Sequence, residues 1–152
     1  MTAPPRLEIR RTSHKGRGVF TLDPILKNQL VLPMRGEILR GDQLTDDMLA
    51  MQIGPDLWLC SDGNRLDDCA NHSCNPNTGF LTGKPELFAL RNIDAGEEIV
   101  WDYSTSLSET GWTLDCACGE ANCRKVVRSW GELEPLHRER LRNWTLEYIR
   151  HL

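Results

Sequence analysis

Three cysteines crowded into one short stretch place the strongest constraint on how this chain folds. Cys116, Cys118 and Cys123 form a C-x-C-x4-C run. Cys116 and Cys118 are poorly placed to bridge each other, because a disulfide requires particular Cα separations and Cβ directions. All three can instead bind one metal ion, with Gly119 allowing the chain to turn between the second and third ligands. The run therefore predicts a structural zinc site that is one ligand short of a tetrahedron.

Cys74, in the stretch NHSCNPN at 71–77, is the best candidate for the fourth ligand. The Asn75-Pro76 turn that follows it predicts an exposed bend rather than the interior of a strand. Cys60 and Cys69 have apolar neighbours and are expected to be core thiols. The alternative is that the four cysteines are unrelated core residues, since free cysteine is among the most buried residue types.

The overall composition of the 152-residue chain is typical of a soluble globular protein. No apolar run has the length of a signal peptide or a membrane span, so we expect a soluble intracellular protein, cytoplasmic or nuclear, with no membrane partner. A reducing compartment favours metal binding over disulfides, which leaves a disulfide-stabilised structural protein as a distant alternative. The formal net charge of −4 argues against a direct nucleic-acid partner and is compatible with a basic peptide. The sequence is compatible with both a monomer and a homodimer.

The pattern of apolar residues predicts a mainly β fold with short helices. Short β-like runs separated by Gly, Pro, Asn and Asp lie at 7–12, 18–22, 29–33, 36–40, 57–61, 78–82, 86–91 and 97–103. Residues 45–53 fit one short helix. Near the end of the chain, six mostly apolar side chains recur at steps of three and four, define one helical face and predict an amphipathic helix within 129–152. They are Leu133, His137, Leu141, Trp144, Tyr148 and Leu152.

Four motifs together resemble the SET-domain protein lysine methyltransferases that carry a post-SET zinc segment. They are HKGRGVF at 14–20, NHSCNPN at 71–77, GEEIVWDYS at 96–104 and CACGEANCRKVV at 116–127, in the order of that family. The resemblance implies a SET-domain fold, with small β-sheets around a pseudoknot, closed by a zinc site and followed by a C-terminal helix. It divides one compact unit into a SET domain (1–115), a post-SET zinc segment (116–128) and the helix (129–152).

The same resemblance implies an enzyme that transfers a methyl group from S-adenosylmethionine to a lysine ε-amine and leaves S-adenosylhomocysteine. Tyr103 matches the catalytic tyrosine of the family, and Trp101 would line the substrate channel with it. The matching cofactor-binding residues are Lys15, Gly16, Arg17, Gly18, Asn71, His72, Val126 and Val127. His72 is expected to bind or brace the cofactor site rather than to transfer protons.

The substrate implied is a lysine-containing protein or peptide, with histone tails among the candidates. Trp101 stands where relatives usually carry Phe or Tyr, so the number of methyl groups transferred stays open. A catalytically silent, zinc-stabilised module that binds a basic peptide is the competing hypothesis, because a fold does not guarantee its usual activity.

Overall fold

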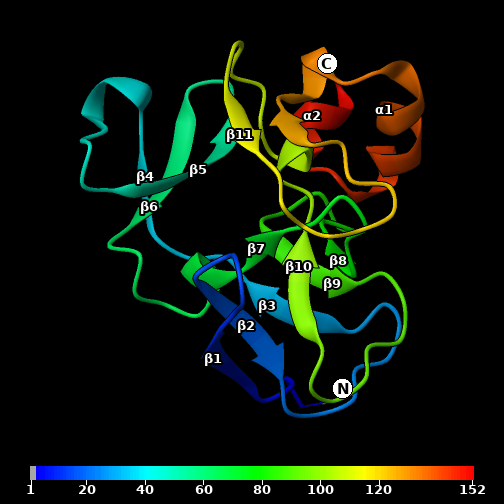
Figure 1. The fold of residues 1–152 in the computed structure, drawn as a ribbon. Coiled ribbons are helices and arrows are strands. Elements are labelled where there is room, and N and C mark those ends of the chain that lie inside the picture. Colours follow the sequence, from blue (N-terminus) through cyan, green and yellow to red (C-terminus); the bar gives the residue numbers. More distant parts are fainter. Residues whose placement is uncertain (1–2) are drawn as a thin grey trace.

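The computed structural model describes residues 3–152, which form four small sheets and two short α-helices (Figure 1). The largest sheet has the strand order β1-β2-β10-β7. Its strands are β1 (Leu7–Arg11), β2 (Arg17–Thr21), β7 (Asn71–His72) and β10 (Glu98–Trp101). The parallel pairing of β7 with β10 sets Asn71 opposite Val100 and His72 opposite Trp101. This pairing brings two of the sequence motifs side by side.

The other sheets surround the first one. One has the order β3-β9-β8, a second β4-β6-β5, and a third consists of β11 and β12. Their strands are β3 (Leu30–Pro33), β4 (Glu37–Leu39), β5 (Leu49–Gly54), β6 (Leu57–Ser61), β8 (Thr78–Gly79), β9 (Glu86–Ala89), β11 (Thr113–Asp115) and β12 (Val126–Arg128). In the view of Figure 1, β11 lies between the β4-β6-β5 sheet and the helices.

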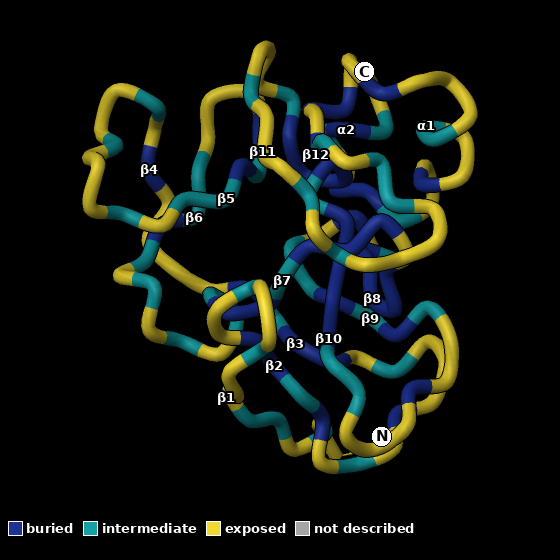
Figure 2. The backbone as a smooth tube through the Cα atoms, viewed as in Figure 1, coloured by how far each residue is buried: buried dark blue, intermediate teal, exposed yellow. Residues whose placement is uncertain are grey.

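One hydrophobic core joins the strands and the end of the chain. Val19 in β2 and Ile99 in β10 are fully buried, and they share a cluster with Phe80, Trp130 and Ile149. Figure 2 shows the buried tube running through β10, β8 and β9, while the outer loops are exposed. Residues after the cysteine run therefore belong to the same hydrophobic core as the strands.

The mainly β architecture is confirmed, but the short helix expected at 45–53 is wrong. Residues 49–54 form β5, which pairs with β6 from Leu49 opposite Ser61 to Gly54 opposite Leu57. The apolar residues at 49, 51 and 53 alternate as a strand requires, and the following Gly54-Pro55-Asp56 turn returns the chain into β6. Pairing with a neighbouring strand therefore overrides the local helical pattern.

The continuous C-terminal helix is also corrected. The segment forms α1 (Pro135–Leu141), a 3₁₀ turn (Arg142–Trp144) and the single turn α2 (Glu147–Arg150). Thr145 is fully buried in an extended conformation, and the amide of Leu146 donates to the carbonyl of Thr105 at 3.1 Å. The helix breaks here because the backbone hydrogen-bonds to the core instead of to itself. Leu133 and Leu141 are buried as expected, whereas Leu152 is exposed.

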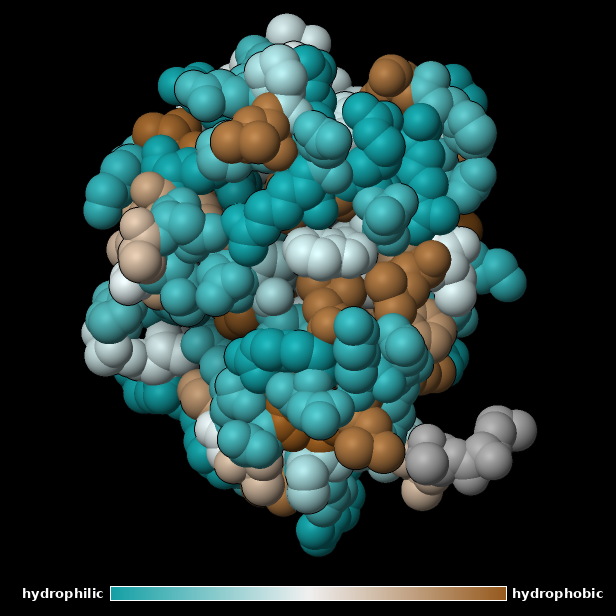
Figure 3. Space-filling model, turned by 90° about the vertical axis from the view of Figure 1, so that its right-hand side faces the viewer, coloured by the Kyte–Doolittle hydropathy of each residue, from teal (hydrophilic) through white to brown (hydrophobic). Residues whose placement is uncertain are grey.

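The surface is mostly hydrophilic, as a net charge of −4 with many charged residues suggests. Figure 3 shows one face, on which hydrophobic residues gather in a short band across the middle between two hydrophilic areas. Among residues 3–152, no helix has the length and apolar character needed to cross a membrane.

Candidate functional site

The four cysteines predicted as metal ligands come together. The sulfur atoms of Cys74, Cys116, Cys118 and Cys123 all lie within 4.8 Å of one another. The Cys74 and Cys116 sulfurs are 3.8 Å apart, which is about the edge of a tetrahedron with Zn–S bonds of about 2.3 Å. The donor set and its size therefore fit a structural zinc ion. Cys60 and Cys69, predicted to be core thiols, are buried outside this cluster.

Backbone amides point at the sulfurs as they do at metal-bound thiolates. The amide of Arg124 donates to Cys74 Sγ, and the amide of Lys125 donates to Cys123 Sγ, each at 3.4 Å. Lys125 reaches this position in the left-handed region, with φ of 66°. Such donors stabilise negative charge on sulfur. Without a metal, burial raises the pKa of the Cys74 thiol to about 11, so four thiolates require a bound cation to offset their charge.

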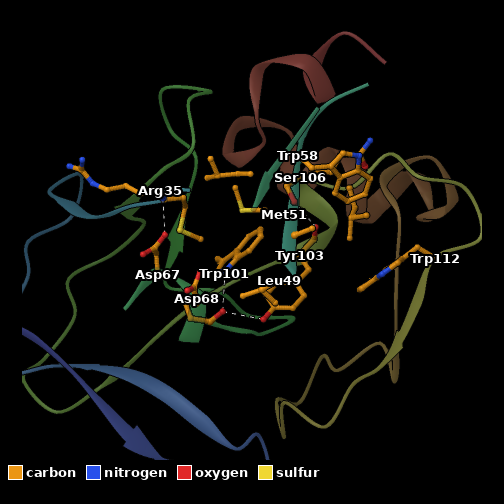
Figure 4. Close-up of a pocket in the computed structure, with 16 residues that line it drawn as sticks. Arg35, Leu49, Met51, Trp58, Asp67, Asp68, Trp101, Tyr103, Ser106 and Trp112 are labelled. Atoms are coloured by element: carbon orange, nitrogen blue, oxygen red, sulfur yellow. Dashed lines mark hydrogen bonds between the residues drawn. The ribbon is translucent and has the colours of Figure 1, made fainter. Parts of the chain in front are cut away.

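An aromatic cavity of about 300 Å³ lies on one side of Tyr103 (Figure 4). Trp58, Trp101, Tyr103 and Trp112 give it aromatic walls. The edge strand β5 contributes further apolar side chains, including Met51, which Figure 4 places close to Tyr103. Trp112 extends toward the cavity from the segment that leads into β11. The cavity is therefore formed between a sheet edge and the start of the cysteine-rich segment.

Tyr103 and Trp101 share one hydrogen-bond acceptor. Tyr103 Oη donates to the carbonyl oxygen of Ala70 at 3.1 Å, and Trp101 Nε1 donates to the same oxygen at 3.3 Å. The two rings lie 4.7 Å apart, and Trp101 also packs edge-to-face on Phe80. Both side chains are thus held firmly at the floor of the aromatic cavity.

The phenol of Tyr103 stays protonated at neutral pH. Burial, assisted by the negative charge of Glu98, raises the pKa of Tyr103 to about 12. A neutral phenol can orient or donate to a ligand, but it is not available as a phenolate base.

A second cavity, here called the cysteine-side cavity, has a volume of about 220 Å³ and also includes Tyr103. Three of the predicted cofactor residues line it, namely Lys15, Asn71 and His72. Its opposite wall is β11 with the first two thiols of the cysteine run. A larger polar hollow of about 510 Å³ continues from it past Lys15 and Cys118. Tyr103 is therefore the residue at which the aromatic and cysteine-side cavities meet.

Five of the predicted cofactor residues do not line this cavity. Gly16 lies in the turn before β2, where its carbonyl accepts from the amide of Thr12, and Arg17 and Gly18 are the first two residues of β2. Val126 and Val127 lie in β12 and pair with Asp115 and Leu114 of β11, which do line the cavity. Val126 and Val127 therefore support the β11 wall of the cavity.

The structure adds residues that the motifs did not single out. Glu98 in β10 accepts from Asn71 Nδ2 at 2.9 Å and lies 3.3 Å from Lys15 Nζ. Asp102 is fully buried and accepts two hydrogen bonds, of 2.7 and 2.9 Å, from the guanidinium of Arg124. Both carboxylates belong to the GEEIVWDYS motif. The Asp102–Arg124 pair is formed only when the cysteine-rich segment folds back.

His72 is buried between the cysteine cluster and Tyr103. Burial lowers the pKa of His72 to about 4, and the nearby charge of Asp102 offsets this only in part. The buried imidazole is therefore a weak base, and its role in bracing the site stays a prediction.

The comparisons with known proteins agree with this geometry. A sequence profile of the SET domain matches residues 16–104. Histone-lysine N-methyltransferase ash1 of Drosophila melanogaster is 32% identical over 140 residues, covering 81% of this chain and 6% of ash1. Histone-lysine N-methyltransferase Su(var)3-9 of Drosophila pseudoobscura pseudoobscura is 30% identical over 157 residues, covering 81% of this chain and 25% of that protein. The chain thus spans only a small part of these relatives.

Solved structures share the fold. KRYPTONITE in complex with mCHH DNA, an H3(1-15) peptide and SAH has a TM-score of 0.64 and 26% identity, covering 81% of this chain and 29% of that one. KRYPTONITE with mCHG DNA and SAH gives a TM-score of 0.66 at the same identity and coverage. With a profile match over more than half of its length and these structural neighbours, the chain belongs to the SET domain family.

Proposed function

We propose that this chain is a protein-lysine N-methyltransferase that moves a methyl group from S-adenosylmethionine to a lysine ε-amine. The observation that carries the proposal is that Tyr103 lines two cavities at once. A transfer between two bound molecules requires a place where both can meet in line, because orientation lowers the barrier by several kcal/mol. The SAH in the KRYPTONITE structures and the names of the sequence relatives support this reading.

The cysteine-side cavity is the proposed cofactor site. S-adenosylmethionine would supply an activated methyl group on its sulfonium. On this chain, Lys15 and Asn71 offer polar groups for the charged end of the cofactor, and Glu98 holds both of them in place. The β11 wall, held by the cysteine cluster, would close the cavity from the other side.

The aromatic cavity is the proposed lysine channel. Its aromatic and apolar walls exclude water from the lysine side chain, and burial of this kind disfavours an ammonium group relative to a neutral amine. The neutral phenol of Tyr103 would then orient the amine and contact the polarised C–H groups of the methyl. Tyr103 and His72 are both unsuited to accept the ammonium proton at neutral pH, so the amine would lose it to bulk solvent before the aromatic walls enclose the lysine side chain.

The substrate backbone is proposed to add to the free edge of β5. In the described residues β5 pairs only with β6, and its other edge borders the aromatic cavity. An extended peptide can pair with such an edge while one side chain enters the cavity. A histone H3 tail is the proposed peptide, by analogy with the H3(1-15) peptide in the KRYPTONITE complex.

Gly18→Ala is expected to weaken S-adenosylmethionine binding about tenfold. A Cβ atom at Gly18 would lie 2.6 Å from Glu98 Oε1 and 3.2 Å from Asn71 Nδ2, so it would push apart the pair that holds the cofactor cavity in shape. Losing one hydrogen bond to a charged group such as Glu98 costs about 1.5 kcal/mol or more, which corresponds to about tenfold in affinity. Calorimetry measures the effect, with Gly131→Ala as control because a Cβ there meets nothing within 4 Å. Equal affinities in both variants would remove Glu98 and Asn71 from the proposed cofactor site.

Gln52→Leu is expected to raise the KM for the peptide while leaving the affinity for S-adenosylmethionine unchanged. The buried Gln52 side chain in β5 accepts from the amides of Ser108 and Glu109 at 2.8 and 3.1 Å. It therefore holds the segment before Trp112 against the aromatic cavity. Leaving a buried amide unpaired costs about 1–3 kcal/mol, so the melting temperature should fall as well.

Gln43→Leu is the matched control for Gln52→Leu, because Gln43 is exposed outside both cavities. An unchanged KM for the peptide in the folded Gln52→Leu protein would show that the segment before Trp112, which Gln52 holds against the aromatic cavity, does not contact the substrate.

The proposal is tested by incubating the zinc-loaded protein with methyl-labelled S-adenosylmethionine and histones, an H3(1-15) peptide or a lysate, followed by mass spectrometry. Labelled lysine is the expected product. A protein that binds S-adenosylmethionine and modifies no lysine would favour the second candidate, a silent module that binds a basic peptide. Trp101 favours this second candidate, because its indole lines the proposed channel at a position where relatives usually carry the smaller ring of Phe or Tyr.

A further inference from the structure

His72 contacts both the cysteine cluster and the residue proposed to carry catalysis. Its Nε2 atom lies 3.4 Å from Cys74 Sγ, and its Nδ1 atom lies 3.1 Å from the backbone nitrogen of Tyr103. The ring also stands edge-on to the Tyr103 ring, with centroids 5.3 Å apart. The imidazole is buried, so these contacts are its main polar interactions in the described structure.

The contact with Tyr103 determines which nitrogen carries the hydrogen. A backbone N–H can only donate, so Nδ1 must accept and the ring hydrogen must lie on Nε2, facing the Cys74 sulfur. Asp102 does not compete for Nδ1, because its nearest oxygen is 3.7 Å away. Both Asp102 oxygens accept from Arg124 instead.

Besides the contacts through His72, a second chain of hydrogen bonds joins Cys74 to the turn that contains Tyr103, and it passes through Arg124 and Asp102. Cys74 Sγ also accepts from the backbone amide of Arg124, whose guanidinium binds Asp102. Asp102 in turn accepts from the amide of Ser104 at 3.1 Å. Two N–H groups therefore converge on one sulfur, and both connections end in the turn that contains Tyr103.

We propose that His72 is a positioning residue that couples the metal-bound Cys74 sulfur to the orientation of Tyr103. This rests on the zinc site and the role of Tyr103 proposed above. The metal holds the sulfur, the sulfur accepts from Nε2–H, and Nδ1 accepts from the Tyr103 amide, so the ring is fixed at both nitrogens. The cysteine cluster would thus position the reacting phenol as well as close the cofactor cavity.

The direct test uses the full chain labelled with ¹⁵N and loaded with ¹¹³Cd in place of zinc. Scalar coupling across N–H···S hydrogen bonds should connect the cadmium to the His72 Nε2 proton and to the Arg124 amide proton. The imidazole nitrogen shifts should show an unprotonated Nδ1. A protonated Nδ1, or coupling to Arg124 without coupling to His72, would overturn the proposal while leaving the metal site intact. Failure to bind cadmium at four sulfurs would overturn the metal site and the proposal with it.

Two amide variants separate the two contacts of His72. In His72→Gln the side-chain amide reaches the Nε2 position, so the cadmium coupling should persist while the Tyr103 amide shift changes and kcat falls about tenfold with KM nearly constant. In His72→Asn the amide oxygen occupies the Nδ1 position, so the Tyr103 shift should persist while cadmium affinity falls about tenfold.

His137→Gln on α1 is the matched control and should change neither signal. If both His72 variants lose only stability, with the Tyr103 shift and the cadmium affinity unaltered, His72 has a merely structural role and the proposal is wrong. Should either variant fail to fold, the coupling measured in the unmodified chain decides the question.

Discussion

Tyr103→Phe is expected to reduce kcat for methyl transfer about 10²–10³-fold while the protein stays folded and still binds S-adenosylmethionine. Removing one polar group aimed at the reacting atoms has an effect of this size in other active sites. The phenol also donates to the Ala70 carbonyl, so the variant should lose about 1 kcal/mol of stability. Steady-state kinetics and calorimetric cofactor binding, measured on the same preparation, separate the two effects.

Tyr148→Phe is the matched control, since Tyr148 is the other tyrosine of the chain and also donates to a backbone carbonyl, that of Ser106. It should lose a similar amount of stability with a far smaller change in kcat, because Tyr148 lines neither cavity. Equal losses of kcat in the two variants would mean that Tyr103 acts through the fold rather than on the substrate.

Removing the metal with a chelator is expected to abolish cofactor binding and to release the segment 113–125 while the β core stays folded. None of residues 111–125 is buried, so this segment has almost no core of its own and depends on the cysteine cluster. It also forms one wall of the cysteine-side cavity. Limited trypsin digestion should then cut after Arg124 or Lys125 faster than in the metal-bound protein, in which the amides of both residues are held by hydrogen bonds to cysteine sulfurs.

Cys116→Ser should reproduce the effect of the chelator, whereas Cys60→Ser and Cys69→Ser should keep one zinc per chain because those thiols lie outside the cluster. A chelated protein that resists trypsin at Lys125 and keeps its affinity for S-adenosylmethionine would contradict the proposed role of the metal.

The cysteine cluster was predictable from the sequence because metal ligands demand particular residue types at short spacing. Cys116, Cys118 and Cys123 have the residue type and spacing of metal ligands, and Cys74 followed from its motif, although the bend there buries Cys74 fully instead of exposing it as expected. Most strands were also predictable, since their apolar residues alternate and turn residues separate them. The position of Tyr103 between two cavities agrees with the role implied by its motif.

Other features depend on contacts between distant segments and left no local signal. The apolar residues within 48–53 fit a helix through steps of three and four, and a strand through the alternation at 49, 51 and 53, and only pairing with β6 decides for the strand. At the end of the chain, Thr145 is extended because its neighbour Leu146 bonds to Thr105. The Ala70 carbonyl that holds Trp101 and Tyr103 is a backbone group, which no side-chain motif can reveal.

The most direct measurement is a crystal structure of the zinc-loaded protein with S-adenosylhomocysteine and a lysine-containing H3 peptide. The cofactor sulfur should lie in the cysteine-side cavity and the lysine nitrogen in the aromatic cavity, with the Tyr103 phenol beside the line that joins them. Cofactor bound among Trp58 and Trp112, or a lysine that does not approach Tyr103, would contradict the assignment of these two cavities.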